Sequence, residues 1–202
     1  MEEGKLSKKD IKIVIAAHKP YRMPEDTMYV PLHVGAEGKK NPDGTPLDLG
    51  YQKDNEGDNI SAKNPNYCEL TGIYYAWKNI PAEYLGLVHY RRYFKGKNKS
   101  KDPFACIVTE PEMEKIFETH RIVVPKKRKY YIETLYSHYA HTHYAEHLDC
   151  VREIIGEQCP DYLNSYDKVI KQTSGYMFNM MVMERALFDS YCAWLFAILF
   201  EL

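Results

Sequence analysis

The chain is predicted to fold as an α/β protein in which helices flank a mainly parallel sheet. Two short apolar runs of strand length, IKIVIAA at 11–17 and YLGLVHY at 84–90, are typical of strands buried on both faces. Between and after them, apolar residues recur at helical spacing. With 202 residues and 45% hydrophobic composition, the chain can form one domain with a substantial core. We therefore expect a single domain over 1–202, with 1–10 as a flexible N-terminal segment.

The first part of the chain alternates strand and helix. Its predicted elements are the strands 11–17 and 28–34, a loop at 35–57, a helix at 64–79 and the strand 84–90. The loop is rich in Gly, Pro, Asn and Asp, which favour turns. An Asn-Pro pair is favourable at the start of a helix, and apolar residues then repeat at helical spacing.

The second part is predicted to be mainly helical. Its expected elements are a helix at 112–119, a strand at 121–124, one long helix at 132–157, a helix at 161–171, a strand at 175–183 and a final helix from 184. The final helix reaches Leu202 without a cap and in the middle of its apolar pattern. We therefore expect the native domain to be truncated here and to continue past this residue.

Composition excludes several classes of protein. The 27 Lys and Arg residues balance 28 Asp and Glu residues, so no global charge points to a nucleic-acid partner. The charged N-terminus and the short apolar runs predict neither a signal peptide nor a membrane span. The five cysteines contain no C-x-x-C pair, which argues against a disulfide framework or a zinc knuckle. We expect a cytoplasmic protein with at most a peripheral contact to the inner face of the membrane.

In the run His89-Tyr90-Arg91-Arg92, the first two residues close the strand 84–90 and the two arginines follow it directly. Ligands of open α/β sheets bind outside the carboxyl ends of the strands. Guanidinium groups match phosphate oxygens in bidentate geometry, so this pattern indicates an anion site, with a diphosphate as the natural ligand. The alternative is that Arg91 and Arg92 are solvated charges paired with carboxylates.

Two histidines share the predicted inward stripe of the helix 132–157. His143 and His147 have the i, i+4 spacing that can hold zinc, but no third ligand is placed by the pattern. Core histidines with satisfied hydrogen bonds are the alternative. Asn179 is a polar residue in an apolar predicted strand, so we expect its amide to be buried and to need partners. It either ties down a neighbouring loop or contacts a sugar hydroxyl. The basic run Lys126–Lys129 is either a solvated loop or a weak contact to anionic lipid.

Five motifs in order carry a resemblance to a known family. They are D-N-I-S at 58–61, N-P-N-Y-C-E-L-T at 64–71, Y-A-W-K-N at 75–79, G-L-V-H-Y-R-R-Y-F at 86–94 and N-M-M-V-M at 179–183, followed by a matching C-terminal Y-C-A-W-L-F-A-I-L-F-E-L. Together they resemble a domain-of-unknown-function family from bacterial capsular and exopolysaccharide gene clusters, described as GT-A-like glycosyltransferases. The match spans residues 10–202.

The resemblance implies a GT-A-like, Rossmann-like domain with a mixed, mainly parallel sheet. It implies transfer of a sugar, galactofuranose or galactose, from a nucleotide-diphosphate donor in capsular or exopolysaccharide biosynthesis. The expected partners are a nucleotide sugar, above all a UDP-sugar, and a polyprenyl-linked or oligosaccharide acceptor, without nucleic acid.

The resemblance also assigns roles at the strand ends. The loop after the first strand, with His18 and Lys19, would cradle the nucleoside, and His89 and Tyr90 would complete the donor site. Most GT-A enzymes carry an Asp-x-Asp metal motif at the later strand end, and this chain has none. We therefore expect Arg91 and Arg92 to neutralise the leaving diphosphate without a cofactor, while a divalent metal stays an open alternative.

A base must deprotonate the acceptor hydroxyl. Glu69 is the first candidate, because its helix is expected to pack beside the strand 84–90, and Asp149 is the second. Either carboxylate could instead be an ordinary solvated side chain. His143 and Asn179 are the candidates for contacts to the acceptor or the sugar.

Three functions remain open on this basis. The first is a glycosyltransferase with the roles given above. The second is a non-catalytic module that binds a nucleotide sugar or a glycan. The third is a metal-dependent hydrolase built on His143 and His147. The donor sugar, the linkage, the stereochemical outcome and the oligomeric state do not follow from the sequence.

Overall fold

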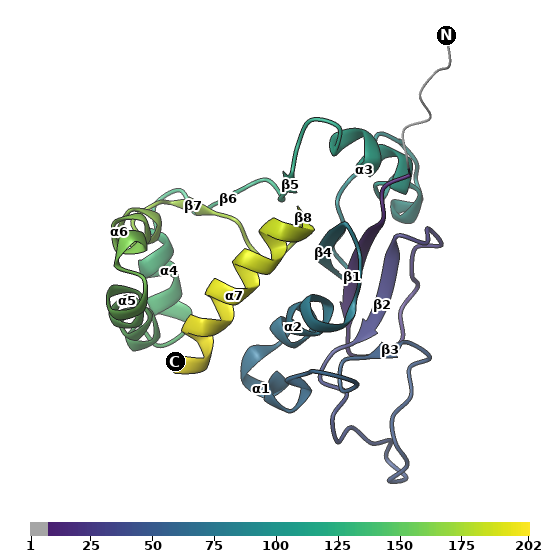
Figure 1. The fold of residues 1–202 in the computed structure, drawn as a ribbon, viewed down its shortest axis with the longest axis horizontal. Coiled ribbons are helices and arrows are strands. Elements are labelled where there is room, and N and C mark those ends of the chain that lie inside the picture. Colours follow the sequence, from purple (N-terminus) through teal and green to yellow (C-terminus); the bar gives the residue numbers. More distant parts are fainter. Residues whose placement is uncertain (1–7) are drawn as a thin grey trace. The chain divides into compact units, whose positions relative to one another are not determined.

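The computed structural model describes residues 8–202, which form two compact units (Figure 1). The first unit extends to Val124 and includes Asn179–Asp189, and the second comprises Pro125–Phe178 and Ser190–Leu202. Each unit is described by itself. The expected flexible segment 1–10 falls mostly on residues outside the described part, and Lys8, within it, forms an ion pair of 2.9 Å with Glu110. Whether the chain is one functional domain stays a prediction.

A six-stranded sheet forms the centre of the first unit. The strand order is β3 (Gln52–Lys53), β2 (Tyr29–His33), β1 (Ile11–Ala17), β4 (Tyr84–His89), β8 (Met181–Glu184) and β5 (Ile122–Val123). The first four strands are parallel to one another, whereas β8 runs antiparallel to both β4 and β5. This arrangement confirms the predicted mixed, mainly parallel α/β fold.

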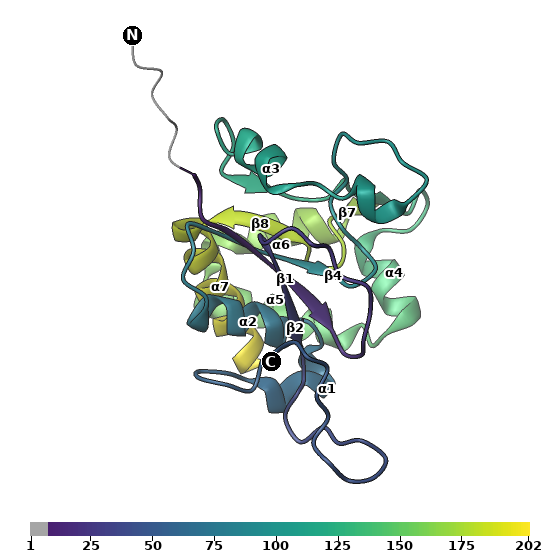
Figure 2. The ribbon, with the colours of Figure 1, turned by 90° about the vertical axis from the view of Figure 1, so that its right-hand side faces the viewer.

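Both faces of this sheet are covered, which explains the continuous apolar runs of β1 and β4. On one face, Ile11, Ile13 and Ile15 pack with Met113 of α3 (Glu110–Ile116). On the other face, α2 (Leu70–Asn79) contacts β1 and β4. Figure 2 shows α2 and α3 on opposite sides of the strands.

A glycine brings the start of α2 to the carboxyl edge of the sheet. A Cβ at Gly72 would lie 2.8 Å from Val34 Cγ1 and 3.7 Å from Leu87 Cδ1. These two side chains lie at the carboxyl ends of β2 and β4. Only glycine allows this close approach. Glu69, at the N-cap of α2, therefore lies at the same edge as the end of β4.

A buried carboxylate connects two loops and the start of α2 at this edge. Asp54 is fully buried and accepts hydrogen bonds from the backbone N–H groups of Gly35 (2.7 Å) and Ala36 (3.0 Å). It also accepts hydrogen bonds from the hydroxyls of Ser61 and, at 2.6 Å, of Thr71. Because every one of these donors is directed at one carboxylate, the loops after β2 and β3 and the start of α2 depend on it.

Asp54→Ala is expected to lower the free energy of unfolding by about 3 kcal/mol or more, because it leaves buried donors without an acceptor. The matched control is Asp43→Ala, which removes an exposed carboxylate bonded to Thr45 and should cost less than about 1 kcal/mol. Urea unfolding of both variants measures the difference. Equal losses would show that Asp54 does not organise this edge.

The second unit is mainly helical. It contains β6 (Arg128–Lys129), α4 (Leu135–Thr142), α5 (Glu146–Gln158), α6 (Leu163–Ile170), β7 (Ser174–Gly175) and the later part of α7 (Arg185–Glu201). β6 and β7 pair antiparallel. Ile154 and Ile155 of α5 form its core with Ile198 of α7. The predicted helix 161–171 and the final helix are confirmed.

The prediction of one long helix at 132–157 is wrong. The helix α4 begins only after Thr134, whose side chain caps it, and it ends at His143, where φ is −143° and ψ is −167°. The Thr142 hydroxyl donates to the carbonyl oxygen of His138 at 3.0 Å. Such local side-chain bonds compete with the helical backbone pattern, and α5 starts afresh at Glu146.

Two further predicted elements are interrupted. The helix 64–79 is broken between α1 (Asn64–Tyr67) and α2, because Cys68 has a φ of 48° and its carbonyl accepts the Asn64 side-chain amide at 2.7 Å. The strand 175–183 is divided into β7 and β8 by Phe178 (φ 70°) and Asn179 (φ 52°). Asparagine tolerates this left-handed region, which ends a strand.

The remaining elements of the described part are 3₁₀ turns at Ser61–Lys63, Pro103–Cys106 and Pro160–Tyr162. The predicted strands 28–34 and 121–124 correspond to β2 and β5, and the helix predicted at 112–119 corresponds to α3. Within residues 8–202, we find no helix with the length and apolar character needed to cross a membrane.

Candidate functional site

The strand β4 ends in a tight turn, His89–Arg92. The backbone N–H of His89 donates to the carbonyl of Arg92 at 3.1 Å, and the N–H of Arg92 donates back at 2.9 Å. The N–H of Tyr90 also donates to Ala16 at the end of β1, at 3.3 Å. The turn is thus fixed to the neighbouring strand, and Tyr90 and Arg91 occupy its two central positions at the carboxyl edge of the sheet.

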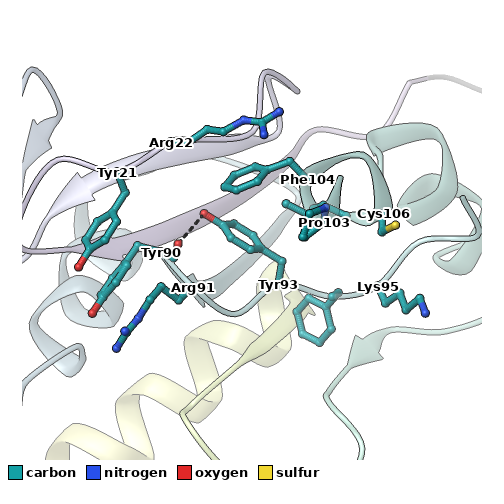
Figure 3. Close-up of a pocket in the computed structure, with 11 residues that line it drawn as sticks. Tyr21, Arg22, Tyr90, Arg91, Tyr93, Lys95, Pro103, Phe104 and Cys106 are labelled. Atoms are coloured by element: carbon teal, nitrogen blue, oxygen red, sulfur yellow. Dashed lines mark hydrogen bonds between the residues drawn. The ribbon is translucent and has the colours of Figure 1, made fainter. Parts of the chain in front are cut away.

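An aromatic cluster joins this turn to the loop after β1. The rings of Tyr90 and Tyr21 stack with centroids 3.9 Å apart, as Figure 3 shows, and His18 meets Tyr90 edge-on at 5.3 Å. Tyr21 was not among the residues that the sequence analysis selected. Two features of the sequence could have pointed to Tyr21. It lies four residues past the end of β1, and the chain has 18 tyrosines against 7 phenylalanines.

Positive charge surrounds these rings. The Arg91 Cζ atom lies 5.0 Å from the Tyr90 ring centroid, and Lys19 Nζ lies 5.5 Å from that of Tyr21. No carboxylate of residues 8–202 forms an ion pair with Lys19 or Arg91. Partial burial, followed by the charges of Lys19 and Arg91, lowers the pKa of His18. The ends of β1 and β4 therefore form an electropositive site suited to an anion.

A cleft of about 570 Å³ opens beside the turn (Figure 3). Aromatic and cationic side chains line most of it, namely Tyr21, Tyr90, Tyr93, Phe94 and Phe104 with Arg22, Arg91 and Lys95. The guanidinium of Arg22 is held over Phe104 at 4.4 Å by a bidentate pair with Asp102. The volume is in the range of small-molecule sites, and flat aromatic walls with cations at the rim suit a nucleotide.

Glu69 and Asn179 meet at the same edge. The Asn179 side-chain amide donates to Glu69 Oε1 at 3.0 Å. Asn179 lies two residues before Met181, which pairs with Leu87, and His89 lies two residues after Leu87. Asn179 and Cys68, the residue before Glu69, both have positive φ angles, which are uncommon for residues other than glycine. Such conformations concentrate at functional sites.

The burial expected for Asn179 is wrong, because its side chain is exposed rather than enclosed in a strand. The reason is its left-handed backbone, which turns the chain before β8 begins. The sequence left two roles open for Asn179, and its contact to Glu69 favours a link between loops. The side-chain amide has a second hydrogen, which this contact leaves for a ligand.

The residues at the end of β4 do not fit a divalent cation. Metal ions such as Mg²⁺ need carboxylate and other oxygen ligands, whereas this position carries Arg91 and Arg92. Among residues 8–202, no group of three or more His, Cys, Asp or Glu side chains is placed to hold a metal.

The remaining predicted residues lie in the second unit. The expected inward face for His143 and His147 is wrong, because both are exposed at the junction that separates α4 from α5. The His143 ring stacks on Tyr139 at 4.7 Å, and His147 Nδ1 lies 3.1 Å from the Tyr139 hydroxyl. Asp149 accepts a hydrogen bond of 3.1 Å from Tyr136.

Comparison with known proteins places the chain in a family. Residues 12–202 match the model of a family described as Domain of unknown function (DUF4422). The chain belongs to this family. The DUF4422 chain is also similar to a solved structure, that of the bifunctional glycosyltransferase WbbM in its apo form, with 30% sequence identity and a TM-score of 0.83. The similarity covers 95% of the chain but only 37% of the WbbM chain. No curated protein matches.

The similarity to WbbM shows that the DUF4422 chain has a glycosyltransferase fold. The sheet order and the β1–β4 edge described above thus belong to a scaffold that the chain shares with part of that protein. The chain spans about a third of the WbbM chain, so the similarity concerns one part of a bifunctional protein.

Proposed function

We propose that the chain is a glycosyltransferase that moves a sugar from a nucleotide-diphosphate donor to a hydroxyl group of a lipid-linked or oligosaccharide acceptor. The observation that carries this proposal is the positive charge of Lys19 and Arg91, which no carboxylate of residues 8–202 pairs, at the joined ends of β1 and β4 beside an aromatic cleft. The glycosyltransferase fold supports it.

In the proposed site, the nucleoside lies against Tyr21 and Tyr90 and the diphosphate lies against Arg91 and Arg92. A UDP-sugar is the expected donor, with galactofuranose or galactose as the sugar and capsular or exopolysaccharide as the product. Because the leaving diphosphate gains negative charge as its bond to the sugar breaks, fixed cations stabilise the transition state more than the ground state. His18, with its lowered pKa, is neutral at pH 7 and can donate or accept a hydrogen bond there.

Glu69 is proposed as the base, with Asn179 orienting it. The acceptor oxygen bonds to the anomeric carbon, and its proton passes to the Glu69 carboxylate. The bond between the anomeric carbon and the diphosphate oxygen breaks, and its electron pair leaves with the diphosphate. Asp149, in the second unit, is the second candidate for the base. His143, in the same unit, is a candidate contact to the acceptor.

The test is release of nucleoside diphosphate from a panel of nucleotide sugars in the presence of candidate acceptors. Turnover of one nucleotide class, lost in Arg91→Ala and retained in the exposed control variant Lys40→Ala, would support the proposal. Tight donor binding without turnover under any condition would instead favour the non-catalytic binding module.

Turnover is expected to persist in excess chelator, because Arg91 and Arg92 supply the positive charge that a metal supplies in sites with Asp-x-Asp. The measurement is the initial rate with and without chelator, followed by addition of Mg²⁺ or Mn²⁺. A rate that vanishes with chelator and returns with the metal would contradict this role of the arginines.

A further inference from the structure

The second unit carries a basic and apolar projection that the proposed reaction does not use. It comprises residues 126–132, with the sequence KKRKYYI, and we call it the basic turn. Its four cations, Lys126, Lys127, Arg128 and Lys129, are all exposed. No carboxylate of the described residues forms an ion pair with any of them.

The end of the basic turn exposes large apolar side chains. Tyr131 is 83% exposed and Ile132 is 93% exposed, the latter more than any other large apolar residue of the described part. The backbone holds them outward, since Tyr131 has a φ of 61° and the N–H of Ile132 donates to the carbonyl of Tyr130 at 2.7 Å. Exposure of an isoleucine side chain to water is unfavourable. Its transfer from water to an apolar medium lowers the free energy of the system.

The base of the projection is ordered and carries no negative charge. β6 pairs with β7, and Lys127 Nζ lies 5.2 Å from the ring centroid of Tyr176, itself 56% exposed. The facing segment 171–176 holds one lysine and no acidic residue. The nearest acid along the chain, Glu133, accepts hydrogen bonds from His138 (2.8 Å) and His141 (2.5 Å) instead.

We propose that the basic turn docks the chain on an anionic lipid surface, with Ile132 and Tyr131 entering the headgroup and acyl boundary. Cations near an anionic leaflet attract it within a Debye length, and an apolar tip adds a short-range contribution. Tyrosine suits this boundary, since its ring is apolar and its hydroxyl is polar. A single-stranded nucleic acid would engage the cations and stack on Tyr131, but acyl chains accommodate an aliphatic side chain such as Ile132 better than bases do.

The experiment is co-sedimentation of the whole chain with vesicles of phosphatidylcholine, with and without phosphatidylglycerol. Binding is expected only to the anionic vesicles. It should weaken when salt is raised from about 0.1 M to about 1 M, which shortens the Debye length from about 10 Å to about 3 Å. Equal binding to neutral vesicles, or no binding to either kind, would overturn the proposal.

Two variants separate the two contributions. Lys126→Glu/Lys127→Glu is expected to lower partitioning by at least about tenfold through charge. Ile132→Ser is expected to lower it by about tenfold through the lost apolar contact. The matched controls are Lys39→Glu/Lys40→Glu, also exposed, and Val169→Ser, 47% exposed, which should leave partitioning unchanged.

A third arm distinguishes the other class of partner. A single-stranded oligonucleotide replaces the vesicles under the same conditions. The proposal would be overturned if the chain bound the oligonucleotide but not the vesicles, and if Lys126→Glu/Lys127→Glu abolished this binding. The partner of the basic turn would then be a nucleic acid. All side chains that are changed are exposed, so thermal unfolding should not differ between these variants and the parent chain.

Discussion

Arg91→Ala is expected to lower kcat/KM for the nucleotide-sugar donor by about 10²–10³, the range seen when one fixed transition-state contact is removed. The residue stands at the centre of the His89–Arg92 turn, which backbone hydrogen bonds hold against β1. Since no carboxylate of the described residues pairs with Arg91, its charge is available to the ligand. Steady-state kinetics with the donor varied measure the loss.

Arg91→Lys is the informative companion. It keeps the charge but removes the planar, bidentate geometry, so recovery of only a small part of the rate is expected. Lys40→Ala, which changes an exposed lysine outside the cleft, should leave the rate unchanged. Full recovery with lysine would mean that charge alone matters, and an unaffected Arg91→Ala would remove this residue from the donor site.

Glu69→Gln is expected to lower kcat by about 10²–10⁴, since a glutamine cannot take the acceptor proton, while donor binding remains. The substitution keeps the size of the side chain and leaves an amide oxygen for the hydrogen bond from Asn179. The measurements are kcat with saturating acceptor and the dissociation constant of the nucleoside diphosphate. If binding and kcat fell together, Glu69 would be part of the donor site and not the base.

Asn179→Ala tests the orienting role. It is expected to lower kcat less than Glu69→Gln does, because the carboxylate remains but loses the amide that orients it. An unchanged kcat would exclude an orienting role for Asn179. Asp149→Asn is the matched control for the alternative base, and a loss of kcat there equal to that of Glu69→Gln would transfer the role to Asp149.

The central sheet could be predicted because its signal is local. β1 and β4 are continuous apolar runs, and burial on both faces leaves such runs no other favourable structure. The position of His89–Arg92 at the carboxyl edge of the sheet could be predicted for the same reason, because this run ends a buried strand. The position of α2 could also be predicted, because α2 is the crossover helix that precedes β4 and packs on it.

The interruptions could not be predicted because single side chains cause them. Asn64 and Thr142 each form a hydrogen bond to a backbone carbonyl, and each bond ends a helix that periodicity alone would continue. Asn179 adopts a left-handed conformation at the point where a strand pattern is unbroken. The stack of Tyr21 on Tyr90 joins loops that lie far apart in the sequence, so only the tertiary structure reveals it.

A crystal structure of the chain with uridine diphosphate, grown in the presence of chelator, tests the central claim most directly. The account predicts the diphosphate against Arg91 and Arg92 at the joined ends of β1 and β4, with the uridine in the cleft beside Tyr21 and Tyr90. Diphosphate bound in the second unit, or bound through a metal held by carboxylates, would contradict it.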